Sequence, residues 1–255
     1  MFDLRQFASI APEWYLRLHY HDELGSTNDE ARRLALEGAE HGTVVLADHQ
    51  SSGRGRRGST WASDPGDGLL FSLVLRPDFE KKFWSRIALA TGLGIAHALR
   101  AGWGVAAEVK WPNDIYVHGR KCAGILAEAR EGFVIVGVGL NVIASPKGGL
   151  SPEGKGVGEP IAVCDVLPSP VSRERVLAAV LDAVLVEVEA CADRFDEQMV
   201  RLREICFLTG KTIAFTASDE RRVGKVVGMG DDGSLRVEVD GAVIAYTQAA
   251  EIRVI

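Results

Sequence analysis

The sequence lacks several features that would place it in a simple class. Its four cysteines form no C-x-x-C pair and have no histidine at metal-ligand spacing, so buried reduced thiols are expected in place of disulfides or zinc. No apolar run is long enough to cross a bilayer. The first residues lack the cationic and apolar regions of a signal peptide. We therefore expect a cytoplasmic protein with no membrane contact.

Positive charge is not in excess. The 255 residues carry 29 Lys and Arg against 35 Asp and Glu, a net charge of -6. General nucleic-acid binding favours a basic surface, so this balance argues against it. Any site for an anion must therefore be local. The length allows one substantial core, or one core with a small satellite domain.

The residue pattern of the first two thirds predicts both helices and strands. A helix is expected from Thr27, where Thr27 and Glu30 fit a capping box, up to the stop at Gly38. A second helix is expected over 83–99, where Gly92 and Gly94 would permit close packing. Further elements are strands over 43–47, 69–75, 105–110, 115–117, 121–129 and 133–142, and a helix with an apolar stripe from Val176 to Val188 after a Ser172 cap.

The residue pattern of the sequence changes after Gly210. Short alternating segments follow, divided by the hairpin-type turns Asp232-Gly233 and Asp240-Gly241. This pattern predicts a small β-barrel, and we place the domain boundary between a unit of residues 1–208 and a unit of residues 209–255. The Gly- and Pro-rich stretch 145–170 is interpreted as a surface excursion of the larger unit.

The most informative segment runs from Gln50 to Trp61. Its glycines let the backbone approach a ligand, and its interleaved arginines add donors suited to phosphate or carboxylate. No acidic residue lies between Asp48 and Asp64, so the charge is uncompensated within the segment. By itself the segment fits a specific anion site, a disordered RNA-binding tract or a merely solvated loop.

Two further segments add chemistry. Lys110 to Ile115, K-W-P-N-D-I, ends a strand at a proline and can project Asn113 and Asp114 into a cleft. Lys121 begins an apolar strand, where a buried lysine needs an anion, although a solvated strand end is the simpler reading. The glycines of Gly137 to Asn141 indicate either a bulge or a close approach to the backbone.

Taken together and in order, these motifs resemble the biotin protein ligase family. The resemblance is carried by Ser26-Thr27-Asn28, Gly53 to Gly58, Lys110 to Asp114, Arg120 to Leu126, and Gly137 to Asn141. It implies an α+β fold: a central mixed or antiparallel sheet flanked by helices, as in class II synthetase-like catalytic domains, with a small C-terminal SH3-like β-barrel. No recognisable nucleophile elbow or triad is present, and the implied chemistry needs none.

The implied activity is an ATP-dependent, AMP-forming biotin–protein ligase that uses Mg²⁺. Biotin would be activated to biotinyl-5'-AMP and transferred to a lysine of a biotin carboxyl carrier protein domain. The biotin motif begins at Ser26, which leaves no space for the N-terminal DNA-binding domain of the repressor members, so DNA binding is not expected. The sequence leaves open whether two copies pair as a homodimer.

The resemblance also implies a role for individual residues. Lys121, Arg56 and Asp114 would be catalytic, with Asp114 also acting indirectly on the metal. The residues implied for biotin are Ser26, Thr27, Asn28, Gln50, Gly53, Arg54, Lys121 and Gly124. Those implied for ATP or the adenylate are Arg54, Arg56, Arg57, Trp61, Asn113 and Asn141.

Three other functions compete with this one. A lipoate or octanoate ligase on the same fold would want an apolar tunnel, whereas the cluster around Ser26 and Gln50 is polar and suits biotin's ureido ring. An RNA-binding module would use the arginine loop with Trp61 stacking, but the acidic balance speaks against it. A biotin-binding scaffold without catalysis would give no function to Lys121, Asp114 or the arginines of the loop.

Overall fold

The computed structural model describes residues 1–146 and 160–255, and the part of the predicted surface excursion that falls on 147–159 lies outside the described residues. The elements follow in the order α1 (Leu4–Ile10), α2 (Pro12–Tyr15), β1 (Leu18–Leu24), α3 (Thr27–Leu36), β2 (Thr43–Gln50), η1 (Arg56–Gly58), β3 (Gly68–Leu75), η2 (Lys81–Arg86), α4 (Ile87–Trp103), β4 (Ala107–Lys110), β5 (Asp114–Val117), β6 (Arg120–Arg130), β7 (Phe133–Asn141), η3 (Val163–Val166), α5 (Arg173–Ala190), α6 (Phe195–Glu204), β8 (Thr212–Ala217), β9 (Glu220–Met229), β10 (Leu235–Val239), β11 (Ala242–Tyr246) and β12 (Ala250–Val254).

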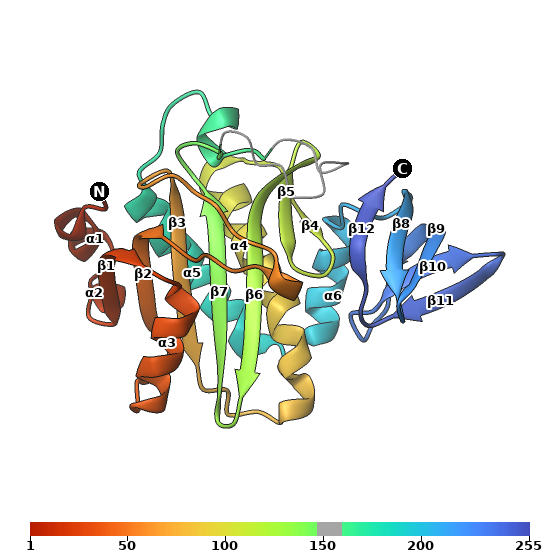
Figure 1. Cartoon of the computed structure of the whole chain (residues 1–255), viewed down its shortest axis with the longest axis horizontal. Helices are drawn as coiled ribbons and strands as arrows, with labels where there is room; N and C mark the ends of the chain where they lie inside the picture. The colour runs from red at the N-terminus through yellow and green to blue at the C-terminus, as the bar shows by residue number, and fades with distance from the viewer. Residues whose placement is uncertain (147–159) are drawn as a thin grey trace.

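A seven-stranded sheet forms the centre of the larger unit, in the order β1-β2-β3-β7-β6-β5-β4 (Figure 1). Its first pair, β1 and β2, is parallel, and the other neighbours are antiparallel. The α+β class with a mixed central sheet is therefore confirmed. None of the helices in the described part of the chain is long and apolar enough to span a membrane.

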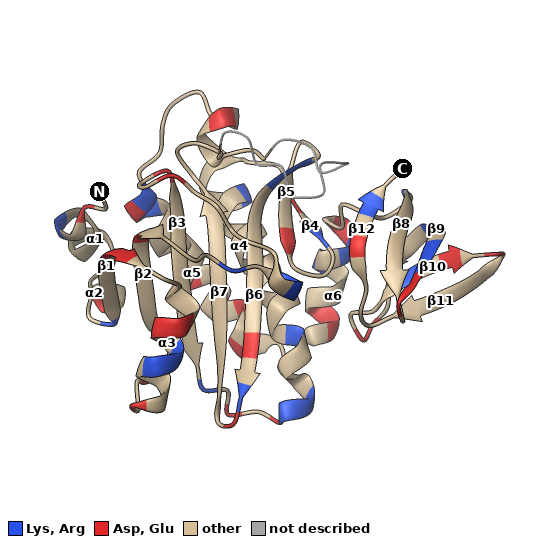
Figure 2. Cartoon of the chain, viewed as in Figure 1, with Lys and Arg blue, Asp and Glu red and all other residues tan. Residues whose placement is uncertain are grey.

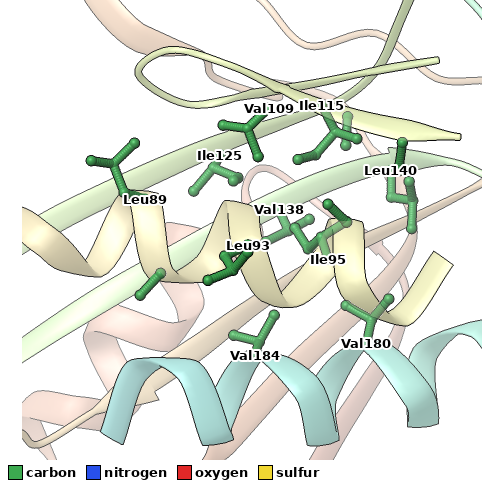
Figure 3. Close-up of a cluster of buried hydrophobic side chains, with 14 of the residues drawn as sticks. Leu89, Leu93, Ile95, Val109, Ile115, Ile125, Val138, Leu140, Val180 and Val184 are labelled. Carbon is green, nitrogen blue, oxygen red and sulfur yellow. The ribbon is translucent and has the colours of Figure 1, made fainter. Parts of the chain in front are cut away.

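Helices cover both faces of this sheet. The strands alternate their side chains, so Val134, Val136 and Val138 of β7 face one side and Phe133 and Ile135 face the other. The first set belongs to the main core together with side chains of α4 and α5, and Figure 3 labels Val138 among them. The second set packs under α3, against Ala31 and Ala35. The face that carries α3 is only partly covered, and the cavity described below lies on it.

Helix α4 is buried between the sheet and α5, and a glycine permits this close packing. A Cβ added at Gly94 would lie 2.7 Å from the Cα of Val184 in α5. One added at Gly92 would meet Ile125 Cδ1 at 3.6 Å, an ordinary contact. The predicted close packing is thus confirmed for Gly94, and the predicted Ser172 cap of α5 is present, since its hydroxyl accepts from the Arg175 N–H at 3.3 Å.

The C-terminal residues form a second sheet of five strands, ordered β11-β10-β9-β8-β12 (Figure 1). This sheet packs against the larger unit. Trp111 Nε1 donates to the carbonyl of Gly233 at 2.9 Å, and the buried Val226 and Leu235 belong to the main core. The small β-unit is confirmed. Its closure into an SH3-like barrel and the boundary at 208/209 stay predictions.

Several elements were not predicted, and one local prediction was wrong. Helices α1, α2 and α6 and strand β1 are absent from the elements expected from the sequence. The capping box is absent: Ser26 is the N-cap of α3 and no side chain caps it. Thr27 is buried and its hydroxyl is engaged by side chains of the sheet, while Glu30 pairs with Arg33. Tertiary hydrogen bonds therefore replace the local ones.

The contact at Gly94 makes a prediction about stability. Gly94→Ala should lower the free energy of unfolding by about 1–3 kcal/mol, because the added methyl group meets helix backbone that cannot move alone. Gly92→Ala is the matched control and should be neutral or stabilising by up to about 1 kcal/mol, the helix propensity gain. Urea denaturation of both variants measures the difference. Equal stability of the two would contradict the packing described.

Candidate functional site

Glycines take the place of large side chains on the sheet face that carries α3. Strand β7 presents Phe133 and Ile135 to α3, and Gly137 and Gly139 follow on the same face. Gly124 of β6 lies directly opposite Gly139. The result is a stretch of bare backbone on the open side of the sheet, next to the first turn of α3.

The indole of Trp61 lies on this bare stretch. A Cβ at Gly124 would be 2.9 Å from Trp61 Cζ3, and one at Gly139 would overlap the indole. The ammonium of Lys121 is 5.6 Å from the ring centroid, within the range of a cation–π contact. The indole N–H is buried and has no acceptor among the described residues.

A buried polar cluster lines the end of the bare stretch next to α3. Gln50 Oε1 accepts from the Thr27 N–H at 2.7 Å and lies 3.1 Å from the Thr27 hydroxyl. The Ser72 hydroxyl lies 2.8 Å from Thr27 Oγ1 and donates to Asn28 Oδ1 at 2.6 Å. Ser26 closes the cluster and is 6 % exposed. The room for Asn28 comes from Gly137, where a side chain would collide with its amide.

The basic loop crosses the sheet face in front of β7 and β6 (Figures 1 and 2). Arg56 Nη1 donates to Asn113 Oδ1 at 3.0 Å, and Asn113 Nδ2 donates to the carbonyl of Ile125 at 2.8 Å. Asn113 therefore ties the loop to β6. Arg57 has φ +54, a left-handed conformation that favours glycine. The guanidinium of Arg54 pairs with Asp29 at 2.7 Å.

Lys121 has the anionic partner that its partial burial demands. Its Nζ lies 2.8 Å from Asp114 Oδ1, with side chains 29 % and 19 % exposed. Beside this pair, Lys110 Nζ donates to the Tyr116 hydroxyl at 2.9 Å. Asp114 is held on the short strand β5, which pairs with β6 in such a register that Asp114 faces Gly124.

These groups surround one cavity of about 710 Å³. Its lining includes most of the predicted site residues: Ser26, Thr27, Asn28, Gln50, Arg54, Arg56, Arg57, Trp61, Asn113, Asp114, Lys121 and Gly124. Gly53 lines the adjoining groove instead, and a Cβ there would collide with the Trp61 carbonyl. Asn141 is buried further along β7 and donates to the Ile161 carbonyl at 3.2 Å. The roles predicted for all these residues stay predictions.

The cavity concentrates positive charge in an acidic chain. Five cationic residues line it, Arg54, Arg56, Arg57, Lys110 and Lys121, against the two carboxylates Asp114 and Glu251. Burial lowers the pKa of Lys110, and burial followed by repulsion from Arg57 lowers the pKa of Arg56. Both cations are thus less stable in their charged form than in water. An anion entering the cavity would offset that cost, so the site is prepared for one.

Three single residues and one segment that contribute to this site were not predicted. Ser72 lies within the apolar strand β3. Its neighbours Phe71 and Leu73 face the main core, so the Ser72 side chain faces the other side of the sheet, where it contacts Asn28. Lys110 begins a recognised motif, yet a strand-end lysine gives no signal of burial. Glu128 contacts Asn28 at 2.7 Å from β6. The segment from Ala249 to Ile252, at the start of β12, also lines the cavity. No motif in the sequence indicates that this distant segment approaches the site.

The described residues contain no group of three or more His, Cys, Asp or Glu side chains placed to hold a metal ion.

The fold and the cavity define an α+β protein that can hold an anion against a bare sheet face beneath a basic loop. The sequence model of the Biotin/lipoate A/B protein ligase family matches residues 23–142, which contain the polar cluster, the loop, Lys121 and both glycine strands. Over these residues the chain is similar to the biotin/lipoate A/B protein ligase family.

Curated relatives match about half of the chain. The bifunctional ligase/repressor BirA of Bacillus subtilis is 40% identical over 134 residues, which cover 51% of this chain and 41% of the relative. The biotin–[acetyl-CoA-carboxylase] ligase of Mycobacterium tuberculosis is 40% identical over 130 residues, 49% of each chain. The matched regions thus span less than half of these two relatives.

A solved structure extends the likeness to almost the whole chain. The biotin protein ligase of Aquifex aeolicus, solved in complex with biotin and ATP, superposes with a TM-score of 0.78 at 25% identity and covers 93% of this chain and 99% of its own. The biotin protein ligase of Leishmania major with biotinyl-5-AMP has a TM-score of 0.63 at 20% identity, which shows the fold alone.

The contact between Trp61 and Gly139 makes a testable prediction. Gly139→Ala should displace the indole from the sheet, because the added methyl group would occupy its place. Acrylamide quenching of tryptophan fluorescence, with Trp61→Phe used to subtract the other tryptophans, should then show a more accessible Trp61. Gly102→Ala, whose methyl group would meet nothing within 4 Å, is the control. Unchanged quenching in Gly139→Ala would contradict the placement of Trp61.

Proposed function

We propose that this protein is an ATP-dependent biotin–protein ligase, which forms biotinyl-5'-AMP and transfers biotin to a lysine of a biotin carboxyl carrier protein domain. The observation that carries the proposal is the convergence of Arg56, Lys121 and the buried polar cluster on one cavity. The Aquifex aeolicus ligase, solved with biotin and ATP, supports it.

The polar cluster suits the ureido ring of biotin. A buried ureido group needs partners for its carbonyl and both N–H groups, and Thr27, Asn28 and Gln50 supply hydroxyl and amide groups at one end of the cavity. The Trp61 indole forms an apolar wall beside them, next to the bare backbone of Gly124 and Gly139. Biotin bound there would direct its carboxylate toward Lys121.

The basic loop suits the nucleotide. Arg56 and Arg57 would hold its phosphates, and Asn113, which receives the Arg56 hydrogen bond, would border it. Trp61 and Asn141 complete the proposed nucleotide wall, with Gly53 and Arg54 between the two ligands. Mg²⁺ bound to the nucleotide would supply further neutralisation of phosphate charge, with Asp114 acting on it indirectly.

The reaction brings two anions together, and the cations of the site make this possible. A carboxylate oxygen of biotin attacks the α-phosphorus of ATP, the bond to the β-phosphate oxygen breaks, and pyrophosphate leaves. Lys121, released from Asp114, neutralises the carboxylate and the charge that develops on the α-phosphate. Placing both reactants on one face adds the advantage of proximity.

The second step uses the mixed anhydride that results. The acceptor lysine amine attacks the biotinyl carbonyl, AMP leaves and an amide bond forms. The loop, tied to β6 through Asn113, would shield the anhydride from water until the acceptor arrives. A nucleophile supplied by the enzyme itself is not required.

A lipoate or octanoate ligase is the other function that the family includes. The polar side chains of Thr27, Asn28 and Gln50 would gain no hydrogen-bond partner from such an acyl chain, whereas a ureido ring offers two donors and an acceptor, which favours biotin. We further propose that the protein acts in the cytoplasm without binding DNA. Pairing of two copies stays open.

Lys121 provides the most direct test of the proposed catalysis. Lys121→Ala should reduce pyrophosphate release on mixing with biotin and ATP at least about 100-fold, as expected for loss of a charged donor at the reacting group. Lys225→Ala, which removes the same charge from an exposed position of the small sheet, should leave the rate unchanged. Near-normal release in Lys121→Ala would remove the role assigned to it.

Arg56 tests the closing of the loop. Arg56→Gly should raise the rate at which biotinyl-5'-AMP dissociates by about tenfold, because the hydrogen bond to Asn113 that holds the loop is lost. Arg57→Gly removes the same charge and accepts glycine without strain at φ +54, so its effect should be smaller. Stopped-flow fluorescence measures both rates. Equal rates in the two variants would show that the Asn113 contact does not hold the loop.

A further inference from the structure

One carboxylate on β6 contacts both the polar cluster and the basic loop. Glu128 Oε2 accepts from Asn28 Nδ2 at 2.7 Å and lies 3.6 Å from Arg54 Nη2. Its side chain is 25 % exposed, so it is neither a free surface group nor a core residue. Glu128 stands on the same face of β6 as Gly124, which is the face of the cavity.

The contact with Glu128 fixes how the amide of Asn28 is turned. An ionised carboxylate only accepts hydrogen bonds, so the amide N–H₂ must face Glu128. Ser72 then donates to the oxygen at the other end of the same amide, at 2.6 Å. Asn28 is 4 % exposed, and a reversed amide would place its oxygen against the carboxylate at a high cost.

The same carboxylate takes part in holding the loop. Arg54 lies between Asp29, at 2.7 Å, and Glu128, at 3.6 Å. Asp29 is shared with Arg32, whose guanidinium lies 2.8 Å away. Arg54 is therefore held by α3 and by β6 together. Glu128 also contacts Asn28, the residue before Asp29, and so connects the loop with the polar cluster.

We propose that Glu128 is a positioning residue that couples the biotin end of the cavity to closure of the loop. This inference rests on the proposed function. Glu128 contacts none of the reacting atoms and acts through Asn28 and Arg54. With the loop closed, Glu128 holds Arg54 and Asn28 in one network. A ligand that is bound by Asn28 and its neighbours then favours closure, and closure favours that ligand by the same factor.

Two variants separate the two contacts. Glu128→Gln keeps a carbonyl oxygen that can accept from Asn28, but it has no charge to attract Arg54. Glu128→Ala loses both contacts. Glu131→Gln is the matched control, because Glu131 is an exposed carboxylate at the β6–β7 turn that lines the same groove as Glu128.

Tryptic cleavage within 51–60 of the ligand-free protein reports on the loop and does not depend on any activity. Both Glu128 variants should be cleaved about two- to fivefold faster than the wild type, the range expected for a partly exposed ion pair. Glu131→Gln should be cleaved at the wild-type rate. Wild-type cleavage in both Glu128 variants would overturn the contact with the loop.

The KM for biotin in pyrophosphate release reports on the polar cluster. Glu128→Ala should raise it about tenfold or more through the lost charged hydrogen bond, and Glu128→Gln should restore most of the affinity. A merely structural effect would lower the melting temperature and leave the KM of Glu128→Ala equal to that of Glu131→Gln, which would overturn the proposal. A wild-type protein that releases no pyrophosphate would refute the proposed function, while the cleavage rates would still decide the role of Glu128 at the loop.

Discussion

The absence of side chains from one stretch of the sheet is the constraint on which the site depends. Gly124, Gly137 and Gly139 leave bare backbone where α3 and the basic loop approach the strands, so Asn28 and the Trp61 indole can reach the sheet. Larger residues on the same face, Phe133 and Ile135, pack under α3 instead. A single strand thus supplies packing at one end and open space at the other.

Charge is arranged around this space in an equally local way. The chain is acidic overall, yet the lining of the cavity carries five cations and two carboxylates. Burial makes Lys110 and Arg56 less stable in their charged form. Binding of two anionic reactants would recover the cost, which links the stability of the empty site to its proposed chemistry.

Sequence reasoning reached most of the fold and much of the site, and its failures have physical causes. Periodicity located the central strands and α5, because a buried face places apolar residues at strand or helix spacing in the sequence. Strand β1 was missed because none of its residues is fully buried, and helix α6 was missed although Phe195, Met199 and Leu202 stand at helical spacing. The capping box at Thr27 failed because Gln50 and Ser72, distant in sequence, compete for the same hydroxyl. Glu128 could not be found, since its partners Asn28 and Arg54 are distant in sequence and lie outside its own strand.

The proposal that a carboxylate oxygen of biotin attacks the α-phosphorus of ATP can be tested by following one oxygen atom. Biotin labelled with oxygen-18 in its carboxylate is incubated with ATP, Mg²⁺, the protein and a biotin-acceptor domain, and the AMP released is weighed by mass spectrometry. The account predicts that AMP acquires one labelled oxygen, because the carboxylate oxygen becomes bonded to phosphorus. Covalently biotinylated acceptor accompanied by unlabelled AMP would contradict it.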